Sequence, residues 1–584
     1  MMKGFLMFVC GRKQYPLMAA AILFWSLTSL VAQDLDSLES VTPLTLYGSV
    51  GASLIGYSAD GIEERREPFS WTINGALDAS LYEIDIPIDF ILSEQEREFR
   101  QPFNRVGLSP GYKWARLHLG YRSINLSDYT LGGTTFLGGG LELTPGDFRI
   151  VGLYGRFQRA VEEDTTEEFV LPAYERWGYG AKIAYQGGGS DIGLIWFRAW
   201  DDSASLDHPP TLVDVRPQEN TILGSTVKFD IVPDRFRFES EGAASVLTRD
   251  IRSAPSDTTD IPAIANDIQT IRNSTTLTLA AKLGLRYTSN NFSTLLGYER
   301  IEPDYESLGA YYFTTDVERY TLEPAFNLME GRFRFSGSIG LERDNLLETK
   351  LARTDRVIGS ALLGWDPTQT FGVDASYLNY STGQVAGRQP LNDTIAVRNV
   401  SQSASLAPRV LLTGESTNHF ITVVGNIQDY TDKNAFTGEF ADSRSLTGNL
   451  IYNLAFVQTP LSTGASLLYS ETTTGTVLTT SVGGSINGST GLFESALSLG
   501  ASIGYTRTTQ QFGGEETGAD VLNENLNASY RLSDADLISF TLYATQSSGD
   551  LSLNSDFNEL TGVLNYSRSF SLKVGEKETA TGTP

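Results

Sequence analysis

Ten charged side chains lie on one face of predicted strands, and their order along those strands suggests ion selection. Six are arginines near one end of their segments, three are glutamates further along, and one is a histidine. They are Arg116, His118, Arg149, Arg235, Arg237, Arg332, Arg334, Glu239, Glu241 and Glu342. If this face lines a water-filled lumen, a ring of guanidinium groups below carboxylates could select ions. The alternative is a hydrated wall with positive charge at one rim, and the sequence leaves both open.

The three histidines of the chain form no enzymatic or metal-binding pattern. His208 falls in a loop, His419 begins a strand, and His118 faces the predicted lumen. No serine motif accompanies any of them, and their spacing is not that of metal ligands. The glycine triplets at 138–140 and 187–189 lack the lysine and helix of a phosphate loop. We therefore predict no enzyme activity, no catalytic residue, no metal and no cofactor.

The first 32 residues have the pattern of a secretory signal peptide. A basic start precedes an apolar run at 17–31, and cleavage is expected near Ala32. Cys10, the one cysteine of the chain, would leave with this segment, so the mature protein would have no thiol chemistry. The net charge of −26 argues against a nucleic-acid partner. No later run of apolar residues is long enough for a transmembrane helix.

The rest of the chain is a uniform series of segments in which apolar and polar residues alternate. In 332–342, for example, Phe333, Phe335, Ile339 and Leu341 fall on one face and polar residues on the other. This period of two predicts β-strands. One apolar and one polar face suits either a water-soluble sandwich or a membrane barrel.

The connections between segments favour the barrel. Every second connection is tight, and those between are mostly longer and often acidic. Short turns at one end and long loops at the other are typical of an outer-membrane barrel. The tight connections are 144–147, 232–235, 288–291, 329–332, 366–369, 414–417, 459–462 and 532–536.

Two further sets of residues follow this division. An aromatic comes just after six tight turns, which predicts a girdle at a membrane interface: Phe148, Phe236, Phe292, Phe333, Phe371 and Phe420. The long loops hold much of the acidic excess, including Glu63, Glu64, Glu67, Glu162, Glu163, Glu167 and Glu168. These carboxylates could bridge divalent cations to lipid headgroups or attract cations to the mouth, or they could simply keep the loops soluble.

We predict an all-β fold: a large single-chain transmembrane antiparallel barrel of about 26 strands, within a range of 24–26, and no plug domain. The count needs a descending strand at 101–108, with Val106 and Leu108 facing lipid, a bulge at Pro102 and a tight turn at 109–112. Otherwise, this segment is a short inward plug.

The predicted regions are a signal peptide at 1–32, a short periplasmic segment at 33–43, the barrel at 44–572 and a polar tail at 573–584. The long stretch at 248–273 could fold inward as a constriction or stand outside as a lid.

So many strands enclose a lumen too wide for side chains to fill. We therefore predict a wide outer-membrane pore for a hydrophilic solute or a polypeptide, gated or filled by a partner. The alternative is a non-conducting structural or interaction barrel, which acts as a surface platform or as a subunit of a secretion or assembly complex. The partners implied are outer-membrane lipids, lipopolysaccharide and a periplasmic protein or lipoprotein.

Residues 103–161 resemble a block in predicted outer-membrane barrels of Bacteroidota, and the end of the signal peptide at Ala32 is similar to theirs. The resemblance covers about 60 residues well and the rest only in its general pattern. It implies an outer-membrane location and a porin-like barrel. Because that group has no agreed function, the resemblance transfers no site residue to this chain.

Overall fold

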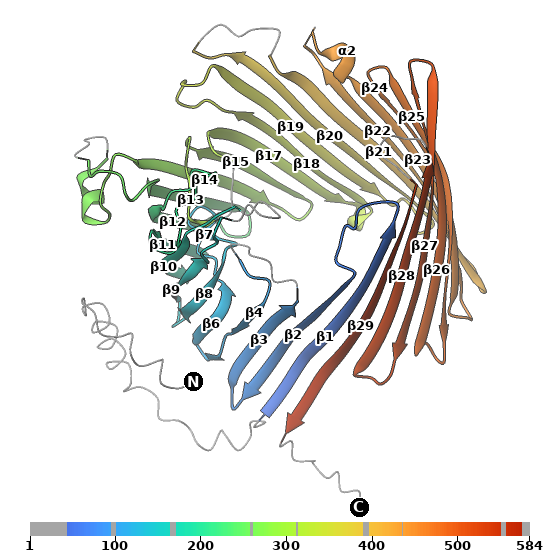
Figure 1. Cartoon of the computed structure of the whole chain (residues 1–584), viewed down its shortest axis with the longest axis horizontal. Helices are drawn as coiled ribbons and strands as arrows, with labels where there is room; N and C mark the ends of the chain where they lie inside the picture. Colours follow the sequence, from blue (N-terminus) through green and yellow to red (C-terminus); the bar gives the residue numbers. More distant parts are fainter. Residues whose placement is uncertain are drawn as a thin grey trace, which may run out of the picture.

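A computed structural model describes residues 44–94, 101–163, 171–256, 261–310, 314–388, 396–434, 436–549 and 556–574. The expected signal peptide and N-terminal segment, and all but two residues of the expected C-terminal tail, lie outside these ranges. Figure 1 shows the described residues as a ring of tilted strands.

The strands follow one another along the chain with few other elements. The first group is β1 (Leu44–Asp60), β2 (Phe69–Leu81), β3 (Ile84–Ser93), β4 (Arg105–Leu108), β5 (Gly111–Tyr112), β6 (Ala115–Ser123), β7 (Leu131–Gly132), β8 (Thr135–Leu143), β9 (Phe148–Gln158) and β10 (Glu175–Gly187). The second is β11 (Ser190–Asp202), β12 (Glu219–Val232), β13 (Phe236–Thr248), η2 (Ala263–Asp267), β14 (Thr275–Thr288), β15 (Phe292–Ile301), β16 (Gly309–Ala310), β17 (Val317–Leu328), η3 (Met329–Gly331) and β18 (Phe333–Arg343). The third is β19 (Ala352–Trp365), β20 (Phe371–Ala386), β21 (Arg398–Thr413), β22 (Thr417–Asp432), α2 (Gly438–Ala441), β23 (Ser443–Phe456), β24 (Leu461–Thr474), β25 (Val477–Leu492), β26 (Leu497–Phe512), β27 (Glu515–Arg531), β28 (Asp536–Gly549) and β29 (Phe557–Val574).

The sheet closes on itself into a barrel. All strands except β7 and β16 belong to one 27-stranded sheet, in which β4 and β5 together make one crossing. The last strand pairs with the first along its whole length, from Leu44↔Val574 to Asp60↔Asn558. The prediction of an antiparallel barrel with about 26 strands is therefore confirmed. Among the described residues, no helix is long and apolar enough to span a membrane.

The connections are divided between the two ends of the barrel, as expected. We call the end with the tight turns the turn rim, and both β1 and β29 have their outer ends there. The opposite end, the loop rim, carries the longer connections. Two connections at the loop rim, at 475–476 and 513–514, are also tight. The sorting is therefore strong but not complete.

The outer face of the wall is a band of apolar residues. On β23 the outward residues from Phe456 to Leu446 are apolar or glycine, and the next outward residue is Arg444. On β26 the same holds from Leu497 to Tyr505. These spans of about 9–11 residues match the length that a tilted strand needs to cross a bilayer.

The aromatic girdle forms at the turn rim with one exception. Phe236, Phe292 and Phe326 belong to a row of ring contacts on the outer face, at centroid distances of 4.8–6.0 Å from one neighbour to the next. Phe420 does not join the girdle. The preceding residue, His419, points outward, so Phe420 points into the lumen. There it lines a cavity together with Asn453.

The crossing predicted at 101–108 exists, but its details differ from the prediction. Only β4 is a regular strand, and it pairs with β3 so that Val106 lies outward beside Phe90, as expected. Before it, the chain leaves the wall, and the Gln101 amide donates hydrogen bonds to main-chain oxygens of Thr135 and Phe157. The described part of this segment is therefore a short strand and not a bulged one.

The expected turn at 109–112 is wrong. The chain turns instead at Lys113, whose φ is 52°, and β5 pairs with β6 just before that turn. Pro110 breaks the strand because proline has no N–H to donate to a neighbouring strand. The sequence resembled a turn because the same residue types also interrupt strands.

Arg122 bridges this interruption from the inner face. Only two residue pairs join β4 to β6. The Arg122 guanidinium contacts the Asp89 carboxylate and donates to the main-chain oxygens of Leu108 and Pro87 at 3.3 and 3.4 Å. It therefore replaces part of the missing strand pairing between β3, β4 and β6.

Replacing Arg122 with alanine should lower the free energy of unfolding by about 1.5–3 kcal/mol, the usual contribution of hydrogen bonds to a charged group. Urea unfolding of the lipid-reconstituted protein, followed by tryptophan fluorescence, measures this. Arg444→Ala is the matched control, because that side chain is 71% exposed and faces Asp429 on the outer surface. Equal losses in the two variants would contradict the bridging role of Arg122.

Candidate functional site

Two loops from the loop rim fold into the barrel and lie against one side of its inner wall. Figure 1 draws β7 inside the ring of strands. We call residues 124–134 and 302–310 the shelf. Its two parts are joined by a parallel pairing of β7 with β16, in which Leu131 lies opposite Gly309. The described residues contain no separate plug domain, but the shelf packs against the inner wall and so enters the lumen.

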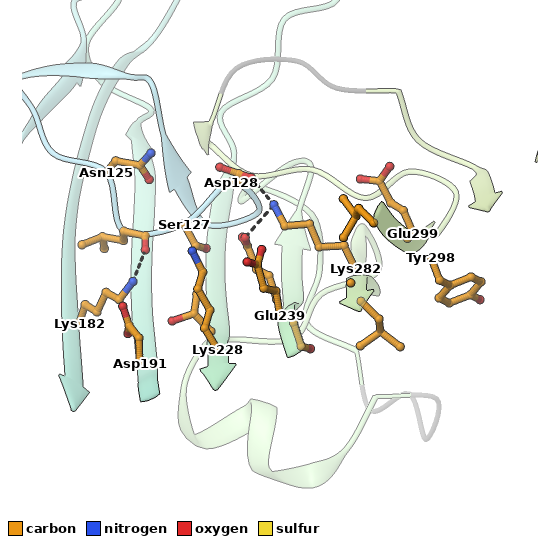
Figure 2. Close-up of a pocket in the computed structure, with 18 of the residues that line it drawn as sticks. Asn125, Ser127, Asp128, Lys182, Asp191, Lys228, Glu239, Lys282, Tyr298 and Glu299 are labelled. Carbon is orange, nitrogen blue, oxygen red and sulfur yellow. Dashed lines mark hydrogen bonds and ion pairs between the residues drawn. The ribbon is translucent and has the colours of Figure 1, made fainter. Parts of the chain in front are cut away.

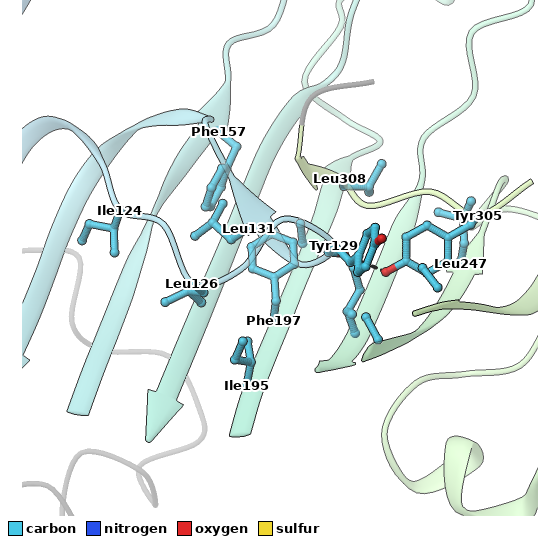
Figure 3. Close-up of a cluster of buried hydrophobic side chains, with 14 of the residues drawn as sticks. Ile124, Leu126, Tyr129, Leu131, Phe157, Ile195, Phe197, Leu247, Tyr305 and Leu308 are labelled. Carbon is cyan, nitrogen blue, oxygen red and sulfur yellow. Dashed lines mark hydrogen bonds between the residues drawn. The ribbon is translucent and has the colours of Figure 1, made fainter. Parts of the chain in front are cut away.

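The shelf stays in place because the wall beneath it is apolar. Its side chains Leu126, Tyr129 and Leu131 are at most 3% exposed and pack into one buried cluster, shown in Figure 3. The wall contributes inward-facing residues of β8 to β13: Phe136, Val151, Leu153, Phe157, Ile195, Phe197, Ile222, Ala243 and Leu247. Burying one such large apolar side chain contributes about 1.5–3 kcal/mol. The shelf and this wall therefore form the larger of the two buried apolar clusters in the described part of the chain.

Polar anchors fix the position of the shelf. The Tyr129 main-chain N–H donates to Glu241 at 3.0 Å, and its hydroxyl donates to Glu299 at 2.6 Å. The Tyr305 hydroxyl donates to the Tyr129 main-chain oxygen at 2.7 Å. Burial raises the pKa of Tyr305, so the phenol stays protonated and remains a donor.

A cavity of about 760 Å³ lies between the shelf and the wall strands β6 to β17. Figure 2 shows lysines and carboxylates facing one another across it. Lys182 donates to the main-chain oxygen of Leu126 at 2.8 Å. Lys282 contacts Asp128 and also Glu241, the latter at 3.1 Å. The cavity is therefore polar, and most of its charges have partners of opposite sign.

The structure brings some of the predicted lumen residues together. Those that line the cavity are His118, Arg149, Glu239 and Glu241. Glu342 is buried nearby, between Arg319 at 2.6 Å and Arg356 at 2.7 Å.

The remaining predicted residues lie apart from the cavity. Arg237 pairs with Asp230 at 3.5 Å, and Arg334 pairs with Asp366 at 2.9 Å. Arg116 lies opposite Glu142 on β8. Arg235 and Arg332 lie in the turns just before β13 and β18, not on the wall.

These contacts change the electrostatic interpretation. The prediction placed arginines at one height and carboxylates above them. Several arginines also have carboxylate partners near their own height: Arg149 pairs with Glu142 at 2.6 Å, and Arg237 pairs at 3.5 Å with Asp230, which lies opposite it on β12. Paired charges partly cancel one another in the lumen, and ion selection by these arginines stays a prediction.

His118 has two polar neighbours that the sequence analysis did not identify. Its Nδ1 lies 2.9 Å from the Ser109 hydroxyl, and its Nε2 lies 3.7 Å from Glu142. A serine, a histidine and a carboxylate can form a nucleophilic site. Here the Ser109 hydroxyl is buried and is not part of the cavity lining, and Glu142 also binds Arg149. The contact therefore joins the interrupted strand segment around Pro110 to β6, and the buried Ser109 hydroxyl does not face the cavity. Within the described ranges, no group of three or more metal-ligating side chains occurs.

The described part of the long stretch at 248–273 lies on the outside of the barrel. Its described side chains Ile261, Ala265 and Ile271 pack against Val246 and Leu277, which point outward from β13 and β14. Figure 1 shows this loop, with η2, projecting from the ring (green, left). Of the two arrangements left open by the sequence, the described part of the loop thus takes the external one.

The shelf does not follow from the predicted strands, although the sequence holds a signal for it. In β9 and β11 both faces are apolar, as in Leu153 beside Tyr154 and Phe197 beside Trp196. A strand with two apolar faces needs cover on both sides. Loss of alternation in these strands could therefore have indicated an inward-folded segment.

The fold and the faces of the wall define the chain as a closed 26-strand antiparallel β-barrel. No protein-family model and no curated protein matches it.

Similar solved structures include OccAB3 of Acinetobacter baumannii, at 11% identity and a TM-score of 0.31, with 65% of this chain and 99% of that chain covered. The copper transporter OprC has 12% identity and a TM-score of 0.36 over 90% of this chain and 80% of its own. Pseudomonas aeruginosa OccK2 in complex with glucuronate has 10% identity and a TM-score of 0.27, with 90% of this chain and 98% of that chain covered. Similarities with such low TM-scores do not indicate which solute this chain transports. Its resemblance to Bacteroidota barrels stays a prediction.

Replacing Tyr305 with phenylalanine should loosen the shelf. It removes the hydrogen bond to the Tyr129 main-chain oxygen and leaves that acceptor buried without this donor, at a cost of about 1–3 kcal/mol. Hydrogen–deuterium exchange of residues 124–134 should become faster. The matched control is Tyr566→Phe, whose hydroxyl donates to Asp536 at 2.6 Å on the exposed outer face. Unchanged exchange in the Tyr305 variant would show that the hydrogen bond does not hold the shelf.

Proposed function

We propose that this chain is an integral outer-membrane barrel that forms a wide aqueous pore for hydrophilic solutes. The observation that carries the proposal is the uncovered inner face of β23 to β28. Apart from glycine, only Ala519 and Ser547 of these strands are buried. Their inward residues are mainly serine, threonine and asparagine, which suit contact with water.

The outer face supports the membrane location. It exposes large apolar side chains all around the barrel, such as Leu194 at 70%, Leu467 at 64% and Ile486 at 62%. A continuous apolar surface of this extent would aggregate in water, whereas it is stable against lipid tails. The predicted signal peptide with cleavage near Ala32 agrees with export across the inner membrane.

Lipids and lipopolysaccharide of the outer membrane are the partners that this surface implies. A gating partner in the periplasm, or a lipoprotein, is part of the same proposal. Carboxylates at the loop rim, including Glu63 and Glu67, could bind divalent cations that join them to lipid headgroups.

The purified protein should give large and stable single-channel steps in planar bilayers. Arg149→Gln should shift the reversal potential in a salt gradient toward cation preference, because it leaves the Glu142 carboxylate without its 2.6 Å partner. Glu142→Gln should shift it in the opposite direction by a similar amount. Both shifts should be small, since the lumen is wide.

The double variant is the control for this pair and should behave like the unmodified protein, because both charges are removed together. A silent barrel that copurifies with lipoproteins would contradict the pore and favour a structural or interaction role. Steady conductance with no shift in either single variant would place the ion pair outside the conducting path.

Glu524→Leu tests the membrane location independently of conductance. This glutamate points outward on β27, between Ile503 and Ala544 of the neighbouring strands, within the apolar band. Removing its charge should stabilise the lipid-embedded barrel by about 1–2 kcal/mol, somewhat less than the value for a basic residue at the bilayer centre. Glu516→Leu, near the loop rim of the same strand, should give no such gain in lipid unfolding titrations. Equal effects would argue against a bilayer around this band.

A further inference from the structure

The lumen has two chemically different sides. The side that carries the shelf is rich in ion pairs, as described above. On the opposite side, the inward positions of β23 to β26 and of β28 hold no charged residue, and those of β27 hold charge only at its ends, at Glu515 and Arg531. We call the inward-facing residues of β23 to β28 the hydroxyl wall.

The polar side chains of the hydroxyl wall bond mainly to one another. Ser466 and Ser485 have their hydroxyls 2.8 Å apart, and Ser462 and Ser489 are 2.7 Å apart. Thr447 with Ser470, and Ser481 with Thr508, form similar contacts at 3.1 and 2.9 Å. Each hydroxyl both donates and accepts, so a pair can exchange its mutual bond for bonds to a passing molecule at little net cost.

Small residues keep this wall smooth. The added Cβ of an alanine at position 464 would come within 2.5 Å of the Asn453 amide and 2.6 Å of the Asn487 amide. The added Cβ at position 500 would meet the Asn527 amide at 2.6 Å. Glycine at these positions lets the amides lie close to the sheet, where they add donors and acceptors without narrowing the path.

The shelf makes this wall the accessible one. It covers the inner side of β8 to β14 and leaves β23 to β28 uncovered by any described residue. A solute that passes the shelf can therefore contact uncharged hydroxyls and amides along these strands. Tyr543 also points inward from β28 and is 52% exposed, which offers a flat apolar face beside the hydroxyls.

We infer that the hydroxyl wall is a path for neutral polyhydroxylated chains, that is, uncharged oligosaccharides. The inference deepens the proposed pore function and rests on it. A sugar hydroxyl matches the wall in both donor and acceptor capacity, so binding is repeated at many weak sites, which is what conduction requires. A polypeptide suits the wall less, because its charged side chains would find no counter-charge there.

The test is partial block of ion current through single channels in planar bilayers. A neutral glucose hexamer should reduce the current in a saturable manner. A hexamer of the same length with one carboxylate per unit should block much more weakly at equal concentration. Ser466→Ala combined with Ser485→Ala should weaken the block by the glucose hexamer about 3- to 10-fold, since it removes two hydroxyls together and leaves neither without its partner.

Thr480→Ala combined with Thr490→Ala is the matched control. These threonines belong to β25 but point outward, so the block should not change. Heat-modifiable mobility on gels verifies that each variant is folded. Asn487→Asp provides a second measurement, because it adds negative charge to the wall with little change in shape and should further weaken the block by the acidic hexamer.

The outcomes separate this inference from the proposed function. A folded barrel without any conductance overturns both. Steady conductance overturns the inference alone if the glucose hexamer gives no block, if the acidic hexamer blocks equally well, or if an uncharged unstructured peptide blocks more strongly. An equal loss of block in the inward and outward double variants also overturns it.

Discussion

Closure of the backbone hydrogen-bond ring is the constraint on which the rest of the structure depends. A sheet with a free edge would expose unpaired N–H and C=O groups, which a hydrocarbon environment cannot satisfy. Pairing of β29 with β1 removes the edge, and the only weakly paired crossing described is the one formed by β4 and β5. There Arg122 supplies donors from a side chain where Pro110 interrupts the strand. The barrel therefore tolerates an interruption because a charged side chain on the water side compensates for it.

A closed ring of this size has no core of its own, so its packing energy comes from elsewhere. The apolar outer band is exposed to the surroundings of the barrel. The hydroxyl wall faces the lumen, and no described segment packs on it. Among the described residues, the sector under the shelf most resembles the interior of a soluble protein, with Phe197 and Leu131 fully buried. Because this buried cluster contains residues of both the shelf and β8 to β13, a displaced shelf would also destabilise these strands. The tyrosine and glutamate contacts between Tyr129, Glu241 and Glu299 then set the height of the shelf in the lumen.

Much of the barrel could be predicted from sequence because strand faces alternate and turns repeat, and both signals are local. The strand count, the closure and the outward position of Val106 all follow from parity. Contacts between distant residues carry no such signal. Nothing near Tyr129 in sequence shows that it meets Glu299, and the pairing of Arg149 with Glu142 depends on strand register. Phe420 failed as a girdle residue because a shift of one position after a turn exchanges the two faces.

The division of the lumen into two sides follows from the same physics that holds the shelf. An inward loop needs an apolar surface to rest on and charged groups to fix it, so both collect on the strands beneath it. The strands on the opposite side support no loop, so their inward serine, glycine and asparagine residues stay open to the water in the lumen. Asn487 and Asn527 are accordingly exposed, because no described segment covers them, whereas Glu342 is buried between two arginines. The charged side thus holds the shelf in place, and in the proposed pore the uncharged side is the one left open to a solute.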